Sequence, residues 1–347
     1  MMDYHAALIG TGRPPNEPHP EGHVAVGYRH GETYRSVEKA TLTACADIKE
    51  ENAIAFARNF DIPESQAYDD HIEMLSQEKP DIVNIATPTS THAELVIDCA
   101  RAGVRAIHCE KPMAASWGEA LLMAQECRRR NVQLTFNHQL RFSEQARQAK
   151  ELLDDGVIGT LTRMEIARTD IYENGTHHID LCGYFNDDRP AEWVLAGIDY
   201  QLRNVKRDVH NENNTVALWE YENGVATLAV MGDHAGMIGC NNRLIGTDGV
   251  IELNLSAPTL RVKQEGSDWE QLDGTTSGAM ASGFGHILET LENDEESLLS
   301  ARRALNTTEI IFSVYESVSQ RGRIDLPLTT WENALEEMVD KGLLTPS

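Results

Sequence analysis

The residues best suited to chemistry are Glu110 and Lys111, which follow directly on a short, mostly apolar run at residues 104–109. Such a run, bounded by a turn signal, is typical of a buried parallel strand, and the carboxyl ends of parallel strands face the ligand crevice of an α/β sheet. We therefore expect Lys111 at the edge of a crevice, where its amine can exchange a proton with a bound molecule. A lone Glu-Lys-Pro tripeptide would be an ordinary solvated turn, so the flanking segments decide between the two interpretations.

A glycine turn near the amino end is the second candidate. Gly10, Thr11 and Gly12 follow a short apolar strand. Glycines at this point let the backbone approach a pyrophosphate at the start of a helix. The third glycine of that fingerprint is missing at its usual spacing, because a proline-rich insertion over residues 13–26 follows the turn. Since such a loop cannot continue as a helix, we expect the crossover helix later, near residues 27–34.

The next strand, expected over residues 41–46, ends in Asp47. A carboxylate at the end of the second strand can bind both ribose hydroxyls of a dinucleotide and repels a 2′-phosphate. The gap between the glycine turn and Asp47 is longer than the usual spacing of about twenty residues. The insertion accounts for the difference.

Three histidines, His19, His23 and His30, lie in or near the insertion. Histidine is a common metal ligand and proton carrier. Their spacing, however, is diagnostic of neither a metal site nor a catalytic site. We interpret them as surface residues or as contacts of a lid.

In the second half of the chain, residues 173–180 carry two adjacent histidines among small and acidic residues. If a helix begins after Gly175, His177 and Asp180 share one face of it, whereas His178 is turned away by about 100°. We therefore expect His178 to be a packed residue of the helix. A zinc site formed by the two histidines is disfavoured because neighbours on different faces do not converge on one ion.

Strands and helices alternate through about the first 137 residues, which predicts a doubly wound parallel sheet of the Rossmann type. A chain of 347 residues with 41% hydrophobic side chains is long enough to form two cores. We therefore expect an α/β protein with a dinucleotide-binding domain over residues 1–137. A substrate-binding and oligomerisation domain of the α+β class is expected over residues 138–347.

The second domain is expected to contain a large, mostly antiparallel open sheet. A helix near residues 144–153 precedes a series of β-rich segments, and Asn-Gly and Asp-Gly pairs at 223–224 and 248–249 predict hairpin turns. Two late helices, near residues 281–292 and 299–320, are expected to pack against this sheet or against the first domain.

Cysteine usage and hydropathy exclude several classes of protein. The six cysteines include no pair at CxxC spacing, so we expect buried thiols and neither a disulfide framework nor a metal centre. No apolar run approaches the roughly eighteen residues needed to span a bilayer, and the amino end lacks the features of a secretory signal. These patterns favour a cytoplasmic protein.

The chain is strongly acidic, with 55 acidic and 30 basic side chains and a formal net charge of −25. Of the 30 basic residues, only 8 are lysine. Such a surface repels nucleic acid and anionic membranes. It is also what a protein adapted to high salt would carry, because salt screens the self-repulsion. An acidic mesophilic enzyme from an arginine-rich genome is the alternative.

Taken together, these segments resemble the Gfo/Idh/MocA oxidoreductases, the family of glucose-fructose oxidoreductase and inositol dehydrogenase. The matching segments are Gly10-Thr11-Gly12, Ala46-Asp47, Ile85-Ala86-Thr87-Pro88 with His92, Gly103, Glu110-Lys111-Pro112, Arg141-Phe142, Gly156, Gly159 and residues 177–181. The combination is far more specific than any single motif. The resemblance covers roughly residues 3–330.

The resemblance implies NAD as the cofactor, with NADP less favoured because Asp47 would repel its extra phosphate. It assigns a set of loop and strand-end residues to the cofactor. These residues are Gly10, Thr11, Gly12, Arg13, Asp47, Ile48, Ala86, Thr87, Pro88, His92, Glu110 and Lys111.

The resemblance also implies the catalytic groups. The peptide bond after Lys111 is typically cis in this family, an isomer that proline permits, and it would aim the lysine at nicotinamide and substrate. His177 is expected to act with Lys111 in proton transfer. Glu173 stands where the family carries aspartate, as a third catalytic candidate with one additional methylene. Asp180 and Arg141 are expected to contact the substrate.

We therefore expect a NAD-dependent dehydrogenase or reductase that moves hydride between nicotinamide and a polyol, sugar or related hydroxyl or ketone compound. Two alternatives stay open: a glycosidase of the same fold that uses NAD transiently, and a non-catalytic NAD-binding regulator. Retention of Lys111 and His177 disfavours the regulator. The resemblance further implies a homodimer or homotetramer formed through the free face of the second-domain sheet.

Overall fold

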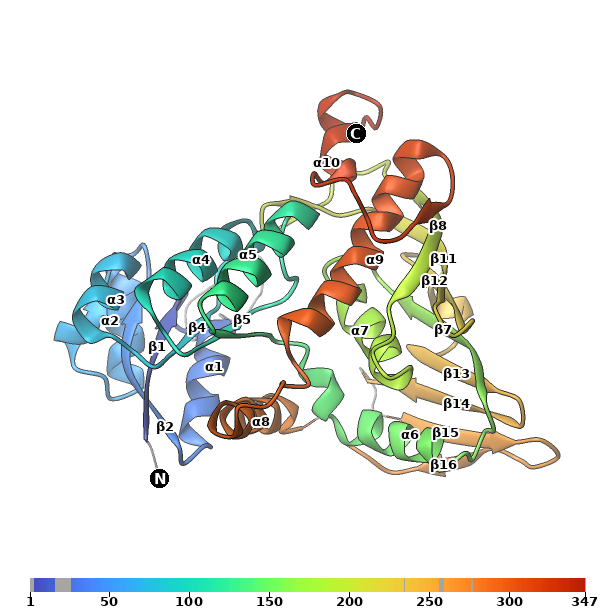
Figure 1. Ribbon diagram of the computed structural model, residues 1–347, viewed down its shortest axis with the longest axis horizontal. Helices are drawn as coiled ribbons and strands as arrows, with labels where there is room; N and C mark the ends of the chain where they lie inside the picture. The colour runs from blue at the N-terminus through green and yellow to red at the C-terminus, as the bar shows by residue number, and fades with distance from the viewer. Residues whose placement is uncertain (1–2, 16–25, 234, 256–258, 276, 347) are drawn as a thin grey trace. The chain divides into compact units, whose positions relative to one another are not determined.

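The computed structural model describes residues 3–15, 26–233, 235–255, 259–275 and 277–346 (Figure 1). Most of the insertion, with His19 and His23, therefore lies outside the described residues. The chain divides into two compact units. Unit 1 comprises Met1–Ala114, Ala120–Asn137 and Met280–Ala301, and unit 2 comprises Ala115–Glu119, His138–Ala279 and Arg302–Ser347.

The chain passes from unit 1 to unit 2 after Asn137, but a single boundary there does not describe the two units. Ala115–Glu119 belongs to unit 2, and Met280–Ala301 belongs to unit 1. The reason is visible in the packing of α8 (Ala279–Asn293), where the Phe284 ring lies 4.7 Å from that of Tyr34 and the backbone of Ile287 accepts a hydrogen bond from Gln133.

Unit 1 is built on a six-stranded parallel sheet with the strand order β3-β2-β1-β4-β5-β6. The strands are β1 (Tyr4–Ile9), β2 (Ala40–Ala46), β3 (Ala67–Tyr68), β4 (Ile82–Ile85), β5 (Ala106–Cys109) and β6 (Gln133–Phe136). Every residue of β4 and β5 is buried, as expected where helices cover both faces of a parallel sheet. The doubly wound Rossmann arrangement is confirmed, and its strand order reverses between β1 and β4, where ligands of such sheets bind.

The helices that connect these strands begin and end at recognisable signals. They are α1 (Val26–Arg35), α2 (Glu50–Asn59), α3 (His71–Glu78), α4 (His92–Ala102) and α5 (Trp117–Arg129), with short 3-10 turns η1 (Glu64–Gln66) and η2 (Thr89–Thr91). Asp70 caps α3 by accepting hydrogen bonds from the Ile72 and Glu73 amides. Gly103 ends α4 in the left-handed conformation, with φ 88°.

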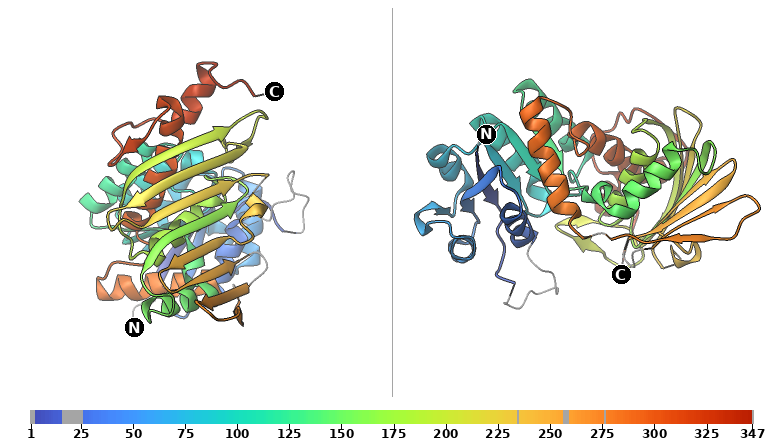
Figure 2. Two further views of the ribbon diagram at one scale, coloured as in Figure 1. Left: turned by 90° about the vertical axis from the view of Figure 1, so that its right-hand side faces the viewer. Right: turned by 90° about the horizontal axis from the view of Figure 1, so that it is seen from below.

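Unit 2 contains a nine-stranded sheet in the order β16-β15-β14-β13-β7-β12-β11-β8-β17. Its strands are β7 (Leu161–Arg168), β8 (Ala191–Asp199), β11 (Asn214–Tyr221), β12 (Ala226–Met231), β13 (Asn242–Gly246), β14 (Gly249–Asn254), β15 (Thr259–Gln264), β16 (Glu270–Leu272) and β17 (Ile324–Asp325). Among these pairs only β7 and β12 run parallel, so the expectation of a mostly antiparallel open sheet is confirmed. Figure 2 (left) looks onto this sheet.

Helices of unit 2 pack on one face of the sheet, as Figure 1 shows for α6 (Glu144–Asp154), α7 (Gly175–Phe185) and α9 (Ala301–Gln320). The smaller elements are η3 (Gln139–Phe142), β9 (Val205–Lys206), β10 (Val209–His210), η4 (Ala235–Met237) and α10 (Ala334–Asp340). In β11 the buried positions alternate with more exposed ones, which is the pattern of a strand packed on one side.

Two expectations from composition can be compared with the fold. All six cysteines are free and buried, as expected. In the described part of the chain, no helix is both long and apolar enough to cross a bilayer.

Candidate functional site

Unit 1 presents the glycine turn at the carboxyl end of β1. Gly10 and Gly12 have φ values of 88° and 67°, in the region that residues with a Cβ rarely adopt. A Cβ on Gly10 would lie 2.5 Å from the Thr87 Cγ2 and 2.9 Å from the carbonyl carbon of Ala86. The turn therefore lies directly against the end of β4, at the point where the strand order reverses.

Gly27 supplies the third glycine that the sequence pattern lacked. It is the second residue of α1, and a Cβ there would lie 2.6 Å from the carbonyl oxygens of both Gly10 and Thr11. Close helix–strand packing of this kind is the role of the third glycine in the dinucleotide fingerprint. The fingerprint is thus complete in space. No glycine stands at the usual spacing, as the sequence shows, because the insertion separates the parts of the fingerprint along the chain.

Asp47 closes this turn from the end of β2. Its Oδ2 accepts hydrogen bonds from the Gly12 amide (2.8 Å) and the Thr11 hydroxyl (3.1 Å). Its Oδ1 accepts from the Lys49 amide (3.0 Å) and the Asn52 side chain (3.2 Å). The carboxylate is therefore held beside the turn in the position expected of a ribose-binding acid.

These features fit a dinucleotide. The turn provides backbone without side chains, Asp47 provides the carboxylate, and Ile48 provides an apolar side chain that is 91% exposed. The other residues assigned to the cofactor border this region. Arg13 and Pro88 are exposed, and Ala86 and Thr87 are half-buried.

Glu110 follows β5 and is buried with only 3% exposure. Its Oε1 accepts hydrogen bonds from the His30 Nε2 (3.0 Å) and the Asn137 amide (2.5 Å), and its Oε2 accepts one from the Lys111 backbone amide (3.2 Å). Burial alone would raise the pKa of Glu110, but the hydrogen bonds from His30 and Asn137 and the charge of Lys111 hold it well below its ordinary value. His30 itself is 1% exposed, so its interpretation as a surface or lid residue is corrected.

The loop that carries Lys111 is held by a second buried histidine. The Lys111-Pro112 peptide bond is cis, as the resemblance implied. His92, at the start of α4, is fully buried and places its Nδ1 3.0 Å from the Pro112 carbonyl and its Nε2 3.1 Å from the Thr87 carbonyl. Burial lowers the pKa of this ring, and the carbonyl bonds oppose the shift. Lys111 is half-buried.

In unit 2, helix α7 carries the paired histidines. His178 is 3% exposed, and its Nδ1 lies 2.5 Å from the Asn242 Oδ1 on β13. Burial lowers the pKa of His178 to about 4, so the ring is neutral and packed, as the helical periodicity indicated. His177 is half-buried and makes an edge contact with the ring of His138, with 5.8 Å between the ring centroids.

The segment that precedes α7 is held by the small hairpin β9–β10. Lys206 lies 3.0 Å from the Oδ2 of Asp170, and the Nε of Arg207 lies 3.1 Å from the Oε1 of Glu173. Burial would raise the pKa of Asp170, but hydrogen bonds from Asn174 and the charge of Lys206 lower it overall. Glu173 is thus paired with a cation of its own unit.

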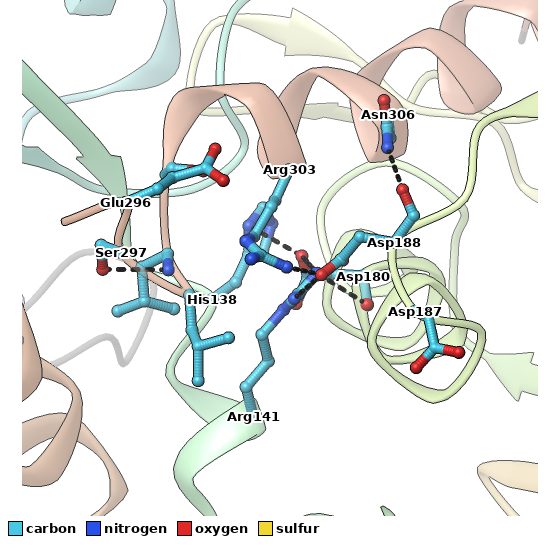
Figure 3. Close-up of polar contacts among 12 residues, drawn as sticks. His138, Arg141, Asp180, Asp187, Asp188, Glu296, Ser297, Arg303 and Asn306 are labelled. Atoms are coloured by element: carbon cyan, nitrogen blue, oxygen red, sulfur yellow. Dashed lines mark hydrogen bonds and ion pairs between the residues drawn. The ribbon is translucent and has the colours of Figure 1, made fainter.

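Arg141 of η3 and Asp180 of α7 belong to a buried cluster of charged side chains, which Figure 3 shows. The Arg141 Nε and Nη2 donate to the two Asp180 carboxylate oxygens at 2.7 and 2.8 Å. Its Nη1 and Nη2 donate to Asp188 at 3.1 and 2.8 Å. Arg303 of α9 also pairs with Asp188, and Asn306 donates to the Asp188 carbonyl at 3.0 Å. The side chain of Arg141 is 1% exposed.

A comparison with known protein families matches the amino-terminal part of the chain. A family model described as an oxidoreductase family with an NAD-binding Rossmann fold, Gfo/Idh/MocA, matches residues 6–138. This segment, less than half of the chain, is thus similar to the Gfo/Idh/MocA family.

Two curated relatives that are similar to part of this chain have different activities. A D-apiose dehydrogenase of Paraburkholderia graminis is 35% identical over 131 residues, which are 38% of this chain and 34% of that protein. A 2,7-anhydro-N-acetylneuraminate hydratase of Mediterraneibacter gnavus is 32% identical over 162 residues, or 47% of this chain and 38% of that protein. The chain thus matches little more than a third of the length of each.

A solved structure extends the likeness to both units. The inositol dehydrogenase homologue of Azotobacter vinelandii, crystallised with NADH and myo-inositol, has a TM-score of 0.77 at 17% identity. The alignment covers 94% of this chain and 98% of that one. The fold of that protein is therefore shared beyond the segment that the family model matches.

The structure distributes the expected Gfo/Idh/MocA residues over the two units. Unit 1 brings the cofactor set together around the glycine turn and the end of β5. Unit 2 holds the remaining expected residues, namely Arg141, Glu173, His177 and Asp180. The roles of all these residues stay predictions. The buried bonds of Arg141 to both Asp180 and Asp188 favour a positioning role for Arg141 and Asp180.

Several residues that hold the site were missed from the sequence or, in the case of His30, assigned to the surface. They are His30, Asn84 and Asn137 in unit 1, and Asp188, Lys206, Arg207 and Arg303 in unit 2. Each acts on a partner far away in sequence. The one local signal was the acid pair Asp187-Asp188 directly after α7.

Proposed function

We propose that this chain is a NAD-dependent oxidoreductase that transfers hydride between nicotinamide and a CH–OH carbon of a sugar, polyol or related hydroxyl or ketone compound. The observation that carries the proposal is the placement of Lys111. It follows β5 in the same unit as the complete glycine fingerprint and Asp47, and its backbone amide is tied to a buried, ionised Glu110. The dehydrogenases among the relatives support the reaction class.

In this proposal each residue has a limited task. A bound nicotinamide supplies the hydride acceptor or donor. Lys111 and His177 exchange the proton of the reacting hydroxyl and stabilise charge that develops on its oxygen. Glu173, held by Arg207, orients the segment in front of His177.

NAD is proposed over NADP because Asp47 already fills the ribose-binding position with negative charge. Lys49 follows closely, and its backbone amide donates a hydrogen bond to this carboxylate.

The test is accumulation of NADH when the purified protein receives NAD and a panel of inositols, aldoses, alditols and sugar acids. We expect steady accumulation with at least one of these compounds, and none with Lys111→Met under the same conditions. Binding of NAD without turnover of any of them would contradict the proposal.

A reaction that regenerates its NAD is the second candidate, because one relative is a hydratase. This class also contains the NAD-using glycosidase expected as an alternative. Conversion of a glycoside or anhydrosugar without accumulation of NADH would favour it. Wild-type and Lys111→Met proteins that bind NAD equally and convert nothing would favour a regulator.

We also propose a homodimer or homotetramer through the open face of the unit 2 sheet. Val216 on β11 and Leu195 on β8 are 57% and 45% exposed there, and Leu195 lies opposite Leu218 in the β8–β11 pairing. Light scattering should report an oligomer for the parent and a monomer for Val216→Asp. A monomeric parent would contradict this interface.

A further inference from the structure

A chain of buried polar groups in unit 1 leads from α1 to Glu110. The Tyr34 hydroxyl donates to the Asn84 Oδ1 at 2.7 Å, and the Asn84 Nδ2 lies 2.9 Å from the His30 Nδ1. The His30 Nε2 then lies 3.0 Å from the Glu110 Oε1. The four side chains are between 0% and 6% exposed, so water does not compete for these bonds.

The order of donors and acceptors fixes the tautomer of His30. Burial raises the pKa of Tyr34 well above its ordinary value, so the hydroxyl keeps its proton and can donate to the Asn84 oxygen. The amide nitrogen of Asn84 then faces His30, and an NH2 group can only donate. The His30 Nδ1 must accept, so the neutral ring carries its proton on Nε2 and donates it to Glu110.

Glu110 passes this constraint to Lys111. One carboxylate oxygen is shared by His30 and Asn137, and the other accepts from the Lys111 backbone amide. The carboxylate is therefore fixed from α1, from the end of β6 and from the lysine itself. A carboxylate with two buried donors on one oxygen has little freedom to rotate, so the peptide that begins Lys111 is held with it.

We propose that His30 is a positioning residue for Lys111: as the Nε2–H tautomer set by Tyr34 and Asn84, it holds Glu110, and through Glu110 the start of the lysine. The inference rests on the proposed function, because it concerns the placement of the group that would exchange the proton. His30 lies on the crossover helix α1, about eighty residues from the lysine in sequence. Nothing in the Glu110-Lys111-Pro112 motif indicates that it positions Lys111.

The first experiment reads the tautomer and needs no substrate. Long-range 1H–15N correlation on histidine-labelled protein should show the His30 ring protonated on Nε2 and unprotonated on Nδ1. Tyr34→Phe removes the donor that orients Asn84, so we expect the His30 signals to change. Tyr4→Phe is the matched control: Tyr4, on β1, is also buried in unit 1, and within the described residues its hydroxyl has no hydrogen-bond partner. A doubly protonated ring or an Nδ1–H tautomer would overturn the inference.

The second experiment compares His30→Gln with His30→Leu. Glutamine keeps an N–H donor near the position of Nε2, whereas leucine removes it. Because misplacing a reacting group by about 1 Å can cost about a hundredfold, we expect His30→Leu to lower kcat by about ten- to a hundredfold without change in NAD binding. His30→Gln should restore most of that loss. Equal rates for parent and His30→Leu, or equal losses for leucine and glutamine, would overturn the inference.

A pH profile separates positioning from general damage to the fold. The titratable groups around the Glu110 carboxylate are His30 and Tyr34 of α1, His92 of α4, His108 and Cys109 of β5, and Lys111. In the parent, Glu110 stays ionised through the acidic range because its pKa is depressed. Loss of the His30 bond raises that pKa, so His30→Leu should lose activity as pH falls, at higher pH than the parent. An unchanged profile would contradict the proposal.

The two proposals can fail separately. A parent that oxidises no sugar or polyol rejects the proposed function, while the tautomer measurement still tests the link between His30 and Glu110. An active parent with an Nδ1–H tautomer rejects the positioning role and leaves the proposed function standing.

Discussion

At the scale of single residues, Lys111 and His177 are the proposed proton-transfer pair, and His178 is the natural control. Loss of a positioned proton-transfer group costs about a hundred- to ten-thousand-fold in rate. We expect Lys111→Met and His177→Ala each to lower kcat on that scale while NAD still binds, as calorimetry can show. His178→Ala should affect turnover much less, because this ring is packed against Asn242.

Two outcomes would contradict the assignment. One is a Lys111→Met protein whose turnover stays within a few-fold of the parent. The other is a larger loss of turnover in His178→Ala than in His177→Ala. That result would show that the catalytic histidine of the family corresponds to His178.

Asp47 is the residue on which cofactor choice is expected to depend. Two unit charges 4 Å apart repel by about 1 kcal/mol even in water, so Asp47→Ala should raise the efficiency with NADP relative to NAD several-fold. Steady-state kinetics with both cofactors give the ratio. Glu51→Ala on α2 removes the same charge from an exposed position and should leave the ratio unchanged. Similar efficiencies with both cofactors in the parent would contradict the prediction.

At the scale of elements, the seating of α1 against the glycine turn depends on Gly27. A Cβ at 2.6 Å from two carbonyl oxygens cannot be accommodated without a shift of the helix. We expect Gly27→Ala to weaken NAD binding strongly, measured by calorimetry, while the protein stays folded. Gly285→Ala in α8 is the control, because a Cβ there has no described neighbour within 4 Å. Undiminished binding in Gly27→Ala would exclude this role.

The orientation of α7 depends on the buried charge cluster around Arg141. Removing one partner of a buried pair typically costs about 3–5 kcal/mol, because the remaining charges stay buried without compensation. Arg141→Met should therefore lower the urea midpoint of unfolding substantially. Arg189→Met breaks the exposed pair with Glu222, for which about 0–1 kcal/mol is expected. Equal midpoints for the two variants would argue that the cluster does not hold the helix.

At the scale of the whole molecule, the net charge of −25 governs the response to salt. Self-repulsion of a highly charged chain opposes compaction, and added ions screen it. We expect the melting temperature to rise from low to molar KCl, whereas an equivalent sucrose series tests for general solute effects. A melting temperature that stays constant or falls with added KCl would contradict adaptation to high salt and favour an ordinary acidic protein.

Local pattern by itself determined most of the elements. The strand expected over residues 41–46 is β2 (Ala40–Ala46), and the helix expected near residues 144–153 is α6 (Glu144–Asp154). The delayed start of α1 was predicted from the prolines of the insertion. These agree because strand and helix periodicity, glycine and proline act over a few neighbouring residues. Strands of two or three residues, such as β9 and β17, were not predicted because two residues cannot show alternation.

Only the tertiary structure decided which residues support the site. Gly27 completes the glycine turn, His30 is buried on Glu110, and Arg303 joins the cluster of Arg141 by pairing with Asp188. These partners lie from 16 to 115 residues apart in sequence. The segment Met280–Ala301 joins unit 1 for the same reason. A hydrogen bond or a close backbone approach between distant segments leaves no periodic trace in sequence. The residues that carry a motif could therefore be identified from the chain alone, whereas those that hold it in place appeared only with the fold.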